Sequence, residues 1–146
     1  MSLEWLETIN MLTISELVVA ASLQRRESRG SHWRSDYEAA RREATEKKRP
    51  LFIVFAAEGC GWCRLLEATT LREPQVIRLL NDRFVPVRVF AEEEQGQSLV
   101  PVFHVRAFPT IVVIAPNGAL VCFLEGYQGP PSLVHALRLA LSPGRH

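Results

Sequence analysis

The hydrophobic and polar positions divide the chain into short segments that alternate between strand and helix periodicity. The continuous apolar run at 51–55 is rich in β-branched and aromatic residues, which is typical of a strand buried on both faces. Runs at 84–90 and 111–115 predict two more strands, and a Pro-Asn-Gly turn at 116–118 leads into a fourth at 119–125. Because so short a connection joins antiparallel neighbours, the last two strands are predicted to form a hairpin.

Helical patterns fill the segments around these strands. Two capping boxes begin at Thr13 and Ser35. In this motif a hydroxyl and a glutamate three residues later bind the free amides at the start of a helix. The two motifs predict helices that end at about residues 28 and 48. Further helices are predicted over 60–70, from Pro74, over 93–104 and after Pro131. Gly96 weakens the prediction of the helix over 93–104. The alternation predicts an α/β domain, with helices on both faces of a mixed four-stranded sheet and an additional N-terminal helix.

The length and composition are those of one globular domain with a terminal addition. The chain has 146 residues, of which 47% are hydrophobic and 23% charged, and these values exclude wholesale disorder. We expect an N-terminal helical extension over 1–34 and a single domain over 35–146. The net charge of +1 gives no general electrostatic reason to expect nucleic acid or an anionic membrane as a partner.

No stretch of the sequence has the pattern of a membrane span or a secretory signal. The longest apolar runs, at 17–21, 51–57 and 111–115, are far shorter than the ~20 residues that cross a bilayer. The first residues lack the basic start and the unbroken apolar run of a signal peptide. A cytoplasmic location is therefore expected, or a periplasmic or exported one if a signal has been removed.

The strongest chemical signal is the motif Cys60-Gly61-Trp62-Cys63, which follows the first strand and begins a helix. Two cysteines three positions apart at a helix N-terminus lie close enough to form a disulfide. Free backbone amides and the helix dipole favour a thiolate on Cys60, and thiolate is the species that attacks disulfides. Cys63, one turn further along, is expected to be more buried and to act second, by displacing the partner from a mixed disulfide.

Two other interpretations of this cysteine pair stay open. A zinc or iron–sulfur site needs about four protein ligands, but only Cys122 and four histidines remain, without a second paired motif. The two cysteines could also be structural and unrelated. A redox dithiol fits the position of the motif best, and no metal is expected. Cys122, within the last predicted strand, is expected to be a buried and inert apolar residue.

From about residue 33 to residue 141 the chain resembles the thioredoxin superfamily. The resemblance rests on the strand at 51–55, the segment Ala57-Glu58-Gly59-Cys60-Gly61-Trp62-Cys63, and Ala107-Phe108-Pro109-Thr110 before the third strand. The stretches 70–76 and 81–87 are most similar to a subgroup of small thioredoxin-like proteins that includes the C-terminal domain of the thiol:disulfide interchange protein DsbD. The resemblance implies a thioredoxin-like fold and redox activity.

The same resemblance implies roles for single residues. Cys60 would be the attacking nucleophile and Cys63 the resolving cysteine. Pro109 would follow a cis peptide bond and face the dithiol across a groove, where the backbone of Phe108 pairs with an extended substrate chain. Trp62 and Gly126 would also contribute to substrate binding. For Gly126 an ordinary turn is an equally open interpretation.

One position departs from the family pattern. Thioredoxins carry a buried aspartate six residues before the first cysteine, where this chain has Val54. In the family that carboxylate helps to move the proton of the resolving cysteine, so the deprotonation of Cys63 must use water or another group. Glu58 is the nearest carboxylate in sequence, and it is expected to be an exposed loop residue.

A second resemblance covers residues 23–37, which are similar to a C-terminal stretch of L-aspartate oxidase and succinate dehydrogenase flavoprotein subunits. The chain contains no glycine fingerprint for FAD, so the resemblance implies no flavin chemistry. The segment could be a fusion remnant, an over-extended start or a coincidence. It could also be a helix that packs on the domain or a basic surface stretch.

The leading hypothesis is a thiol:disulfide oxidoreductase that acts through Cys60 and Cys63 on disulfide-containing protein substrates. It would need no cofactor beyond the dithiol and would exchange electrons with a protein redox partner. The first alternative is a thioredoxin-fold binding module without redox turnover, and the second is a metal-binding dithiol. A monomer is expected, with no nucleic-acid or membrane partner.

Overall fold

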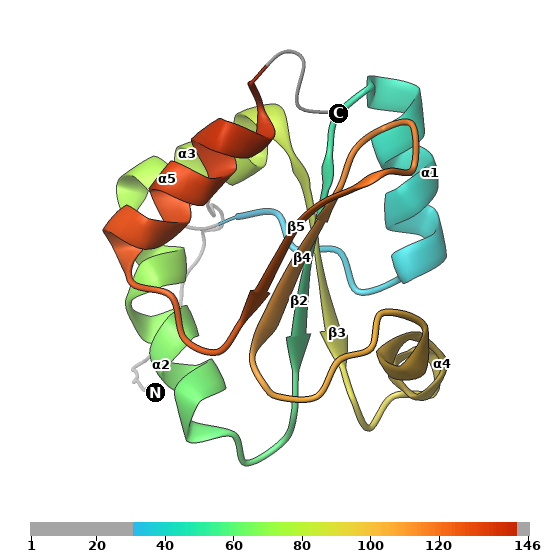
Figure 1. Cartoon of the computed structure of the whole chain (residues 1–146), viewed down its shortest axis with the longest axis vertical. Coiled ribbons are helices and arrows are strands. Elements are labelled where there is room, and N and C mark those ends of the chain that lie inside the picture. Colours follow the sequence, from blue (N-terminus) through green and yellow to red (C-terminus); the bar gives the residue numbers. More distant parts are fainter. Residues whose placement is uncertain (1–30, 143–146) are drawn as a thin grey trace, which may run out of the picture. The chain divides into compact units, whose positions relative to one another are not determined.

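A four-stranded mixed sheet forms the centre of the computed structural model, which describes residues 31–142 (Figure 1). The sheet has the order β3-β2-β4-β5, and its strands are β2 (Leu51–Ala56), β3 (Val85–Phe90), β4 (Thr110–Ile114) and β5 (Leu120–Glu125). β2 runs parallel to β3 and antiparallel to β4, and β4 runs antiparallel to β5. The predicted mixed sheet and its terminal hairpin are both confirmed.

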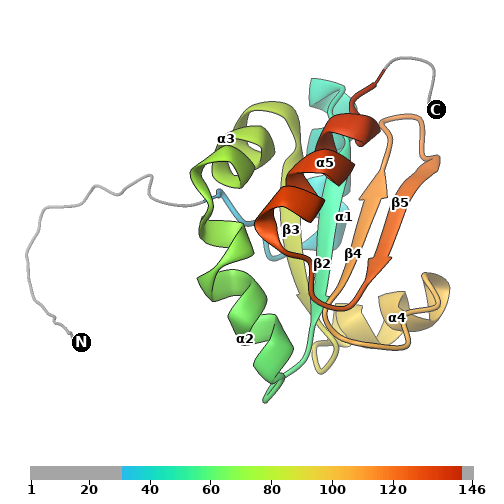
Figure 2. The same ribbon diagram turned by 60° about the vertical axis from the view of Figure 1, so that its left-hand side comes forward.

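Helices cover both faces of this sheet (Figures 1 and 2). One face carries α1 (Tyr37–Lys47) and α4 (Glu94–Val102). The other carries α2 (Gly61–Ala68), the short 3-10 helix η4 (Thr70–Arg72), α3 (Pro74–Arg83) and α5 (Pro130–Ala140). Along β2, Phe52 and Val54 pack against the second group of helices, whereas Ile53 and Phe55 pack against the first. This two-sided burial explains why the strand is apolar at every position.

The start of α1 differs from its prediction by one residue. Asp36, not Ser35, is the N-cap, and its carboxylate accepts a hydrogen bond of 3.1 Å from the Ala39 amide. The side chain of Gln95 in α4 holds the backbone on both sides of Asp36: its amide group donates to the Ser35 carbonyl and accepts from the Tyr37 amide. A capping box centred on Ser35 is therefore wrong, because a tertiary contact selects the neighbouring cap. The helix predicted from Thr13 lies outside the described residues.

Gly96 has a packing role that the sequence pattern does not convey. It is buried within α4, and a methyl group in its place would collide with the carbonyl group of Phe90 at the end of β3. The glycine that weakened the helix prediction is what lets this helix approach the strand closely. The predicted helix at 93–104 is present as α4, with Pro101 in its last turn.

A short segment before α1 continues the sheet beyond the edge strand β3. The Arg34 amide donates to the Pro86 carbonyl at 2.9 Å, and the Arg88 amide donates to the Arg34 carbonyl at 3.0 Å. The Arg34 guanidinium pairs with Glu43 of α1, which ties the segment to both β3 and α1. Within residues 31–142, no helix has the length and apolar character needed to span a membrane.

Candidate active site

The two motif cysteines meet where β2 ends and α2 begins. Gly59 turns the chain with φ +74°, in the left-handed region that favours glycine, and Cys60 follows as the N-cap of α2. The Cys63 amide donates a hydrogen bond of 3.1 Å to the Cys60 sulfur. Cys60 and Cys63 form a disulfide, with 5.3 Å between their Cα atoms. The structure thus brings together the two residues for which the sequence predicts a bridge.

The two sulfur-bearing residues differ in access to solvent. Cys60 is half-buried, whereas Cys63 is 6% exposed and belongs to the core face of α2. An incoming disulfide can therefore reach Cys60 more readily than Cys63. This asymmetry is the one that the sequence predicts for a nucleophile and a resolving cysteine.

The loop before β4 faces the dithiol. The Phe108–Pro109 peptide bond is cis, as the family resemblance implies, and the Phe108 carbonyl oxygen lies 3.7 Å from the Cys60 sulfur. Pro109 is buried, and its carbonyl accepts a hydrogen bond of 2.8 Å from the Gly126 amide. Gly126 has φ +86°, a conformation that favours glycine. This conformation fits both a glycine that contributes to substrate binding and a glycine in an ordinary turn. The Phe108 carbonyl therefore lies beside Cys60, and Gly126 is joined to the same loop through Pro109.

Trp62, between the cysteines, projects from the first turn of α2. Its side chain is 61% exposed, and its ring lies 5.9 Å from that of Tyr127, measured between centroids. The Thr69 hydroxyl donates to the Leu65 carbonyl, so the Tyr127 hydroxyl, at 2.9 Å, donates to Thr69. Tyr127 was not predicted from the sequence, although its position directly after Gly126 is a signal that could have found it.

The interior below α2 departs from the thioredoxin pattern as predicted. Val54 is 1% exposed and packs in the same core cluster as Leu66 of α2. Glu58 is exposed, as expected, and its backbone amide donates to the Glu92 carboxylate. Another carboxylate on the motif helix, that of Glu67 on α2, was not predicted from the sequence. Its place four residues after Cys63 was the available signal.

Cys122, the third cysteine, lies apart from the motif. It is a free thiol on β5 and is half-buried, so the expectation of full burial holds only in part. Burial raises the pKa of the Cys122 thiol, which fits an unreactive residue. Among residues 31–142, no three histidine, cysteine, aspartate or glutamate side chains are grouped as metal ligands would be.

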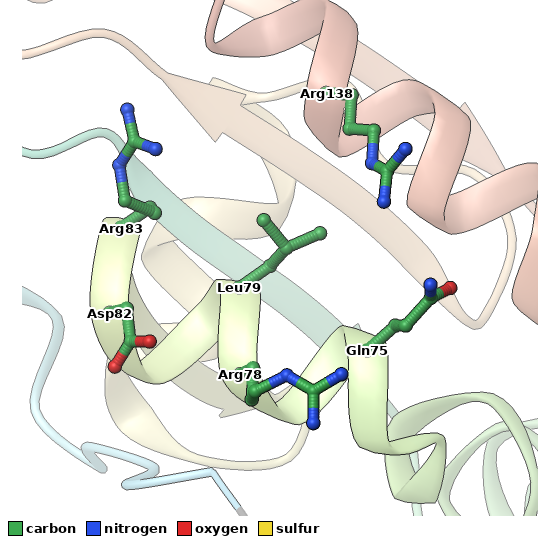
Figure 3. Close-up of a pocket in the computed structure, with 6 residues that line it drawn as sticks. All are labelled: Gln75, Arg78, Leu79, Asp82, Arg83 and Arg138. Carbon is green, nitrogen blue, oxygen red and sulfur yellow. The ribbon is translucent and has the colours of Figure 1, made fainter.

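A second surface feature that the sequence did not predict lies between α3 and α5. It is a cleft of about 280 Å³, lined by Gln75, Arg78, Leu79, Asp82, Arg83 and Arg138. Figure 3 shows Arg138 pointing from α5 toward α3. Three guanidinium groups against one carboxylate make this cleft electropositive, which favours anionic groups. No element of the dithiol site contributes to it.

The chain belongs to the thioredoxin-like family, whose family model matches residues 32–116, more than half of the chain. A model described as the C-terminal part of fumarate reductase flavoprotein matches residues 1–60. This second match is in line with the resemblance of residues 23–37 to flavoprotein subunits.

Single proteins and structures agree with the family assignment. Human spermatogenesis-associated protein 20 is 30% identical over 95 residues, which are 61% of this chain and 12% of that protein. Protein disulfide-isomerase of Datisca glomerata is 27% identical over 88 residues, 60% of this chain and 17% of that protein. The chain therefore spans less than a fifth of either relative. A thioredoxin from Thermus thermophilus superposes with a TM-score of 0.72 at 30% identity, over 79% of this chain and 90% of that one.

Proposed function

We propose that the protein is a thiol:disulfide oxidoreductase that exchanges its Cys60–Cys63 pair with disulfides of protein substrates. The observation that carries the proposal is the position of this pair. It lies at the N-terminus of α2, with the more accessible sulfur 3.7 Å from the Phe108 carbonyl. A dithiol held in this way can alternate between reduced and oxidised forms without a cofactor.

Cys60 acts as the nucleophile in this proposal. When the pair is reduced, the Cys63 amide and the N-terminal dipole of α2 stabilise negative charge on the Cys60 sulfur. The thiolate attacks one sulfur of the substrate disulfide, and the other substrate sulfur leaves as a thiolate that takes up a proton from solvent. The product is a mixed disulfide between Cys60 and the substrate.

Cys63 resolves this intermediate. Its thiolate attacks the Cys60 sulfur, the Cys60–Cys63 bond forms, and the second substrate sulfur leaves. Each cycle transfers two electrons to the substrate, so a dithiol-bearing protein partner has to restore the reduced pair. The reverse sequence oxidises a substrate dithiol by the same steps.

The substrate chain is proposed to lie against Phe108, Pro109, Gly126 and Trp62. The carbonyl of Phe108 is an acceptor for an amide of an extended peptide, which is the backbone pairing used in β-augmentation. Trp62 offers an exposed aromatic surface next to the reacting sulfur. The similarity to a protein disulfide-isomerase supports a protein, rather than a small molecule, as the substrate class.

Trapping of the mixed disulfide tests this proposal. In a Cys122→Ser background, Cys63→Ser should hold a disulfide-bonded protein such as insulin in a covalent complex that dithiothreitol releases. Cys60→Ser should form no complex and should lose disulfide reductase activity. Retention of full activity in Cys60→Ser would refute the assignment.

The alternative, a binding module without turnover, is supported by Val54, because this chain lacks the aspartate that thioredoxins have at this position. A double variant, Cys60→Ser with Cys63→Ser, separates the two functions. If it captures a client protein as well as the unchanged chain does, and the unchanged chain reduces no disulfide, the binding module is the better description.

A further inference from the structure

Val54 occupies the buried position at which thioredoxins carry an aspartate. A positively charged side chain, that of Arg88, nevertheless lies beside it. Val54 of β2 is the direct Cα partner of Arg88 in the parallel strand β3. Directly paired residues of neighbouring strands project to the same face of a sheet, so Arg88 lies on the face that α2 covers. A positive charge therefore stands next to a strand position that offers no carboxylate.

Arg88 is held in place by two groups. Its Nε atom lies 2.9 Å from a carboxylate oxygen of Glu67 on α2, an ion pair in which the Nε–H group is not aligned for a hydrogen bond. Its guanidinium carbon lies 4.8 Å from the centre of the Trp33 ring. The ion pair is partly shielded from solvent, with 26% of the Arg88 side chain and 39% of the Glu67 side chain exposed. The carboxylate near Arg88 thus comes from the helix rather than from β2.

Glu67 is also a neighbour of the resolving cysteine. Cys63 and Glu67 are four residues apart on α2, and side chains with this spacing lie on the same side of a helix, with Cβ atoms about 5–6 Å apart. A single water molecule can bridge two polar groups that do not touch directly. Other charged or titratable groups on α2 and the elements around it are Arg64, Arg72, Arg88 and Tyr127.

We propose that Glu67 is the proton acceptor for Cys63, through one water molecule, and that Arg88 is the positioning residue that holds its carboxylate. The inference rests on the proposed function. In the resolving step the Cys63 thiol gives its proton to Glu67, and the resulting thiolate attacks Cys60. The Cys60–Cys63 bond forms, the bond from Cys60 to the substrate sulfur breaks, and that sulfur leaves and takes up a proton.

The resolving step can be measured with dithiobis-nitrobenzoate at one equivalent per reduced protein, in a Cys122→Ser background. Attack by Cys60 releases a first thionitrobenzoate, and attack by Cys63 releases the second in a phase that does not depend on protein concentration. Glu67→Gln should slow the second phase about 100-fold at pH 7, the lower limit of the range for loss of a general base. The first phase should change little and serves as an internal control.

The pH profile separates proton transfer from a structural effect. A thiol with an ordinary pKa of about 8.5 is only a few per cent ionised at pH 7. The second phase of Glu67→Gln should therefore rise about tenfold per pH unit and approach the unchanged protein near pH 9. A defect in packing would instead lower the rate equally at every pH. Glu58→Gln, which removes the other nearby carboxylate, should match the unchanged protein.

A rescue variant and two contrary outcomes complete the test. Glu67→Gln combined with Val54→Asp should recover much of the rate at pH 7, since it returns a carboxylate to Arg88 from β2. If the second phase and its pH profile are the same in Glu67→Gln as in the unchanged protein, the inference is overturned and the proposed function stands. If the unchanged protein shows no second phase at any pH, the proposed function itself fails.

Discussion

The carbonyl oxygen of Phe108 lies 3.7 Å from the sulfur of Cys60, so the loop before β4 forms a wall beside the dithiol. Pro109 anchors this wall through its hydrogen bond with Gly126, at the end of β5. In the proposed function, a substrate disulfide reaches Cys60 beside this wall and near the exposed ring of Trp62. The geometry therefore restricts how a substrate chain can present its disulfide.

Removal of the Tyr127 ring should lower the activity of the protein toward disulfides of protein substrates. The ring contacts Trp62, and an aromatic pair contributes about 0.5–1.5 kcal/mol, which corresponds to about 2- to 12-fold. We expect Tyr127→Ala to lower kcat/KM for insulin reduction by a factor in this range. Tyr127→Phe keeps the ring and loses only the hydroxyl, so it should lie closer to the unchanged protein. Equal losses in both variants would contradict the role of the ring.

Gly96→Ala should destabilise the fold. The added methyl group meets the backbone of Phe90, and neither strand nor helix can move away cheaply. Overpacking of this kind costs about 1–3 kcal/mol, so the melting temperature should fall by at least about 4 °C. Gly61→Ala is the matched control, because a methyl group there meets no atom within 4 Å. A gain in stability for Gly96→Ala, as at an exposed helix position, would contradict the account.

Glu43 should make the stability of the domain depend on acid pH. Hydrogen bonds from Arg34 and then Lys47 lower the pKa of the Glu43 carboxyl from 4.5 to about 2. Because the pKa is lower in the folded protein, this stabilisation is present above about pH 5 and disappears as the pH falls toward 2. Solvent screening limits it to about 1 kcal/mol. Urea titrations should show Glu43→Gln to be less stable at pH 7, with the difference vanishing near pH 2.

Cys122 should react slowly with thiol reagents. Burial raises the pKa of its thiol, so less thiolate is present at neutral pH than in an exposed cysteine. In the reduced native protein at pH 7, iodoacetamide should label Cys60 well before Cys122, as peptide mass spectrometry can show. Prior labelling of Cys122 would contradict this order. Cys122→Ser should leave insulin reduction unchanged.

Local sequence patterns sufficed for most of the fold. The apolar run at 51–55 and the Pro-Asn-Gly turn at 116–118 predicted a buried strand and a hairpin, because burial on two faces and a short turn leave direct marks in a sequence. The N-cap of α1 was misplaced, since its selection depends on Gln95, about 60 positions away. The role of Gly96 was missed for the same reason.

The residues of the candidate site fall into the same two groups, those marked by a local motif and those that depend on tertiary contacts. Cys60, Cys63 and Pro109 stand in recognisable motifs, so the sequence could single them out. Tyr127 and the Glu67–Arg88 pair make contacts between distant segments, and the local signals for them, a place directly after Gly126 and four residues after Cys63, are weak because many surface residues share such spacings. The arginine-lined cleft between α3 and α5 likewise arises only when the two helices pack.

The central claim is that Cys60 and Cys63 are a functional redox pair, and a redox titration tests it most directly. The Cys122→Ser protein is equilibrated in glutathione and dithiothreitol buffers, quenched with an alkylating reagent and analysed by mass. A functional pair should show a reversible two-electron transition between about −270 and −120 mV, the range from thioredoxin-like reductants to strong oxidants. If no disulfide forms at any redox poise, the redox account is contradicted.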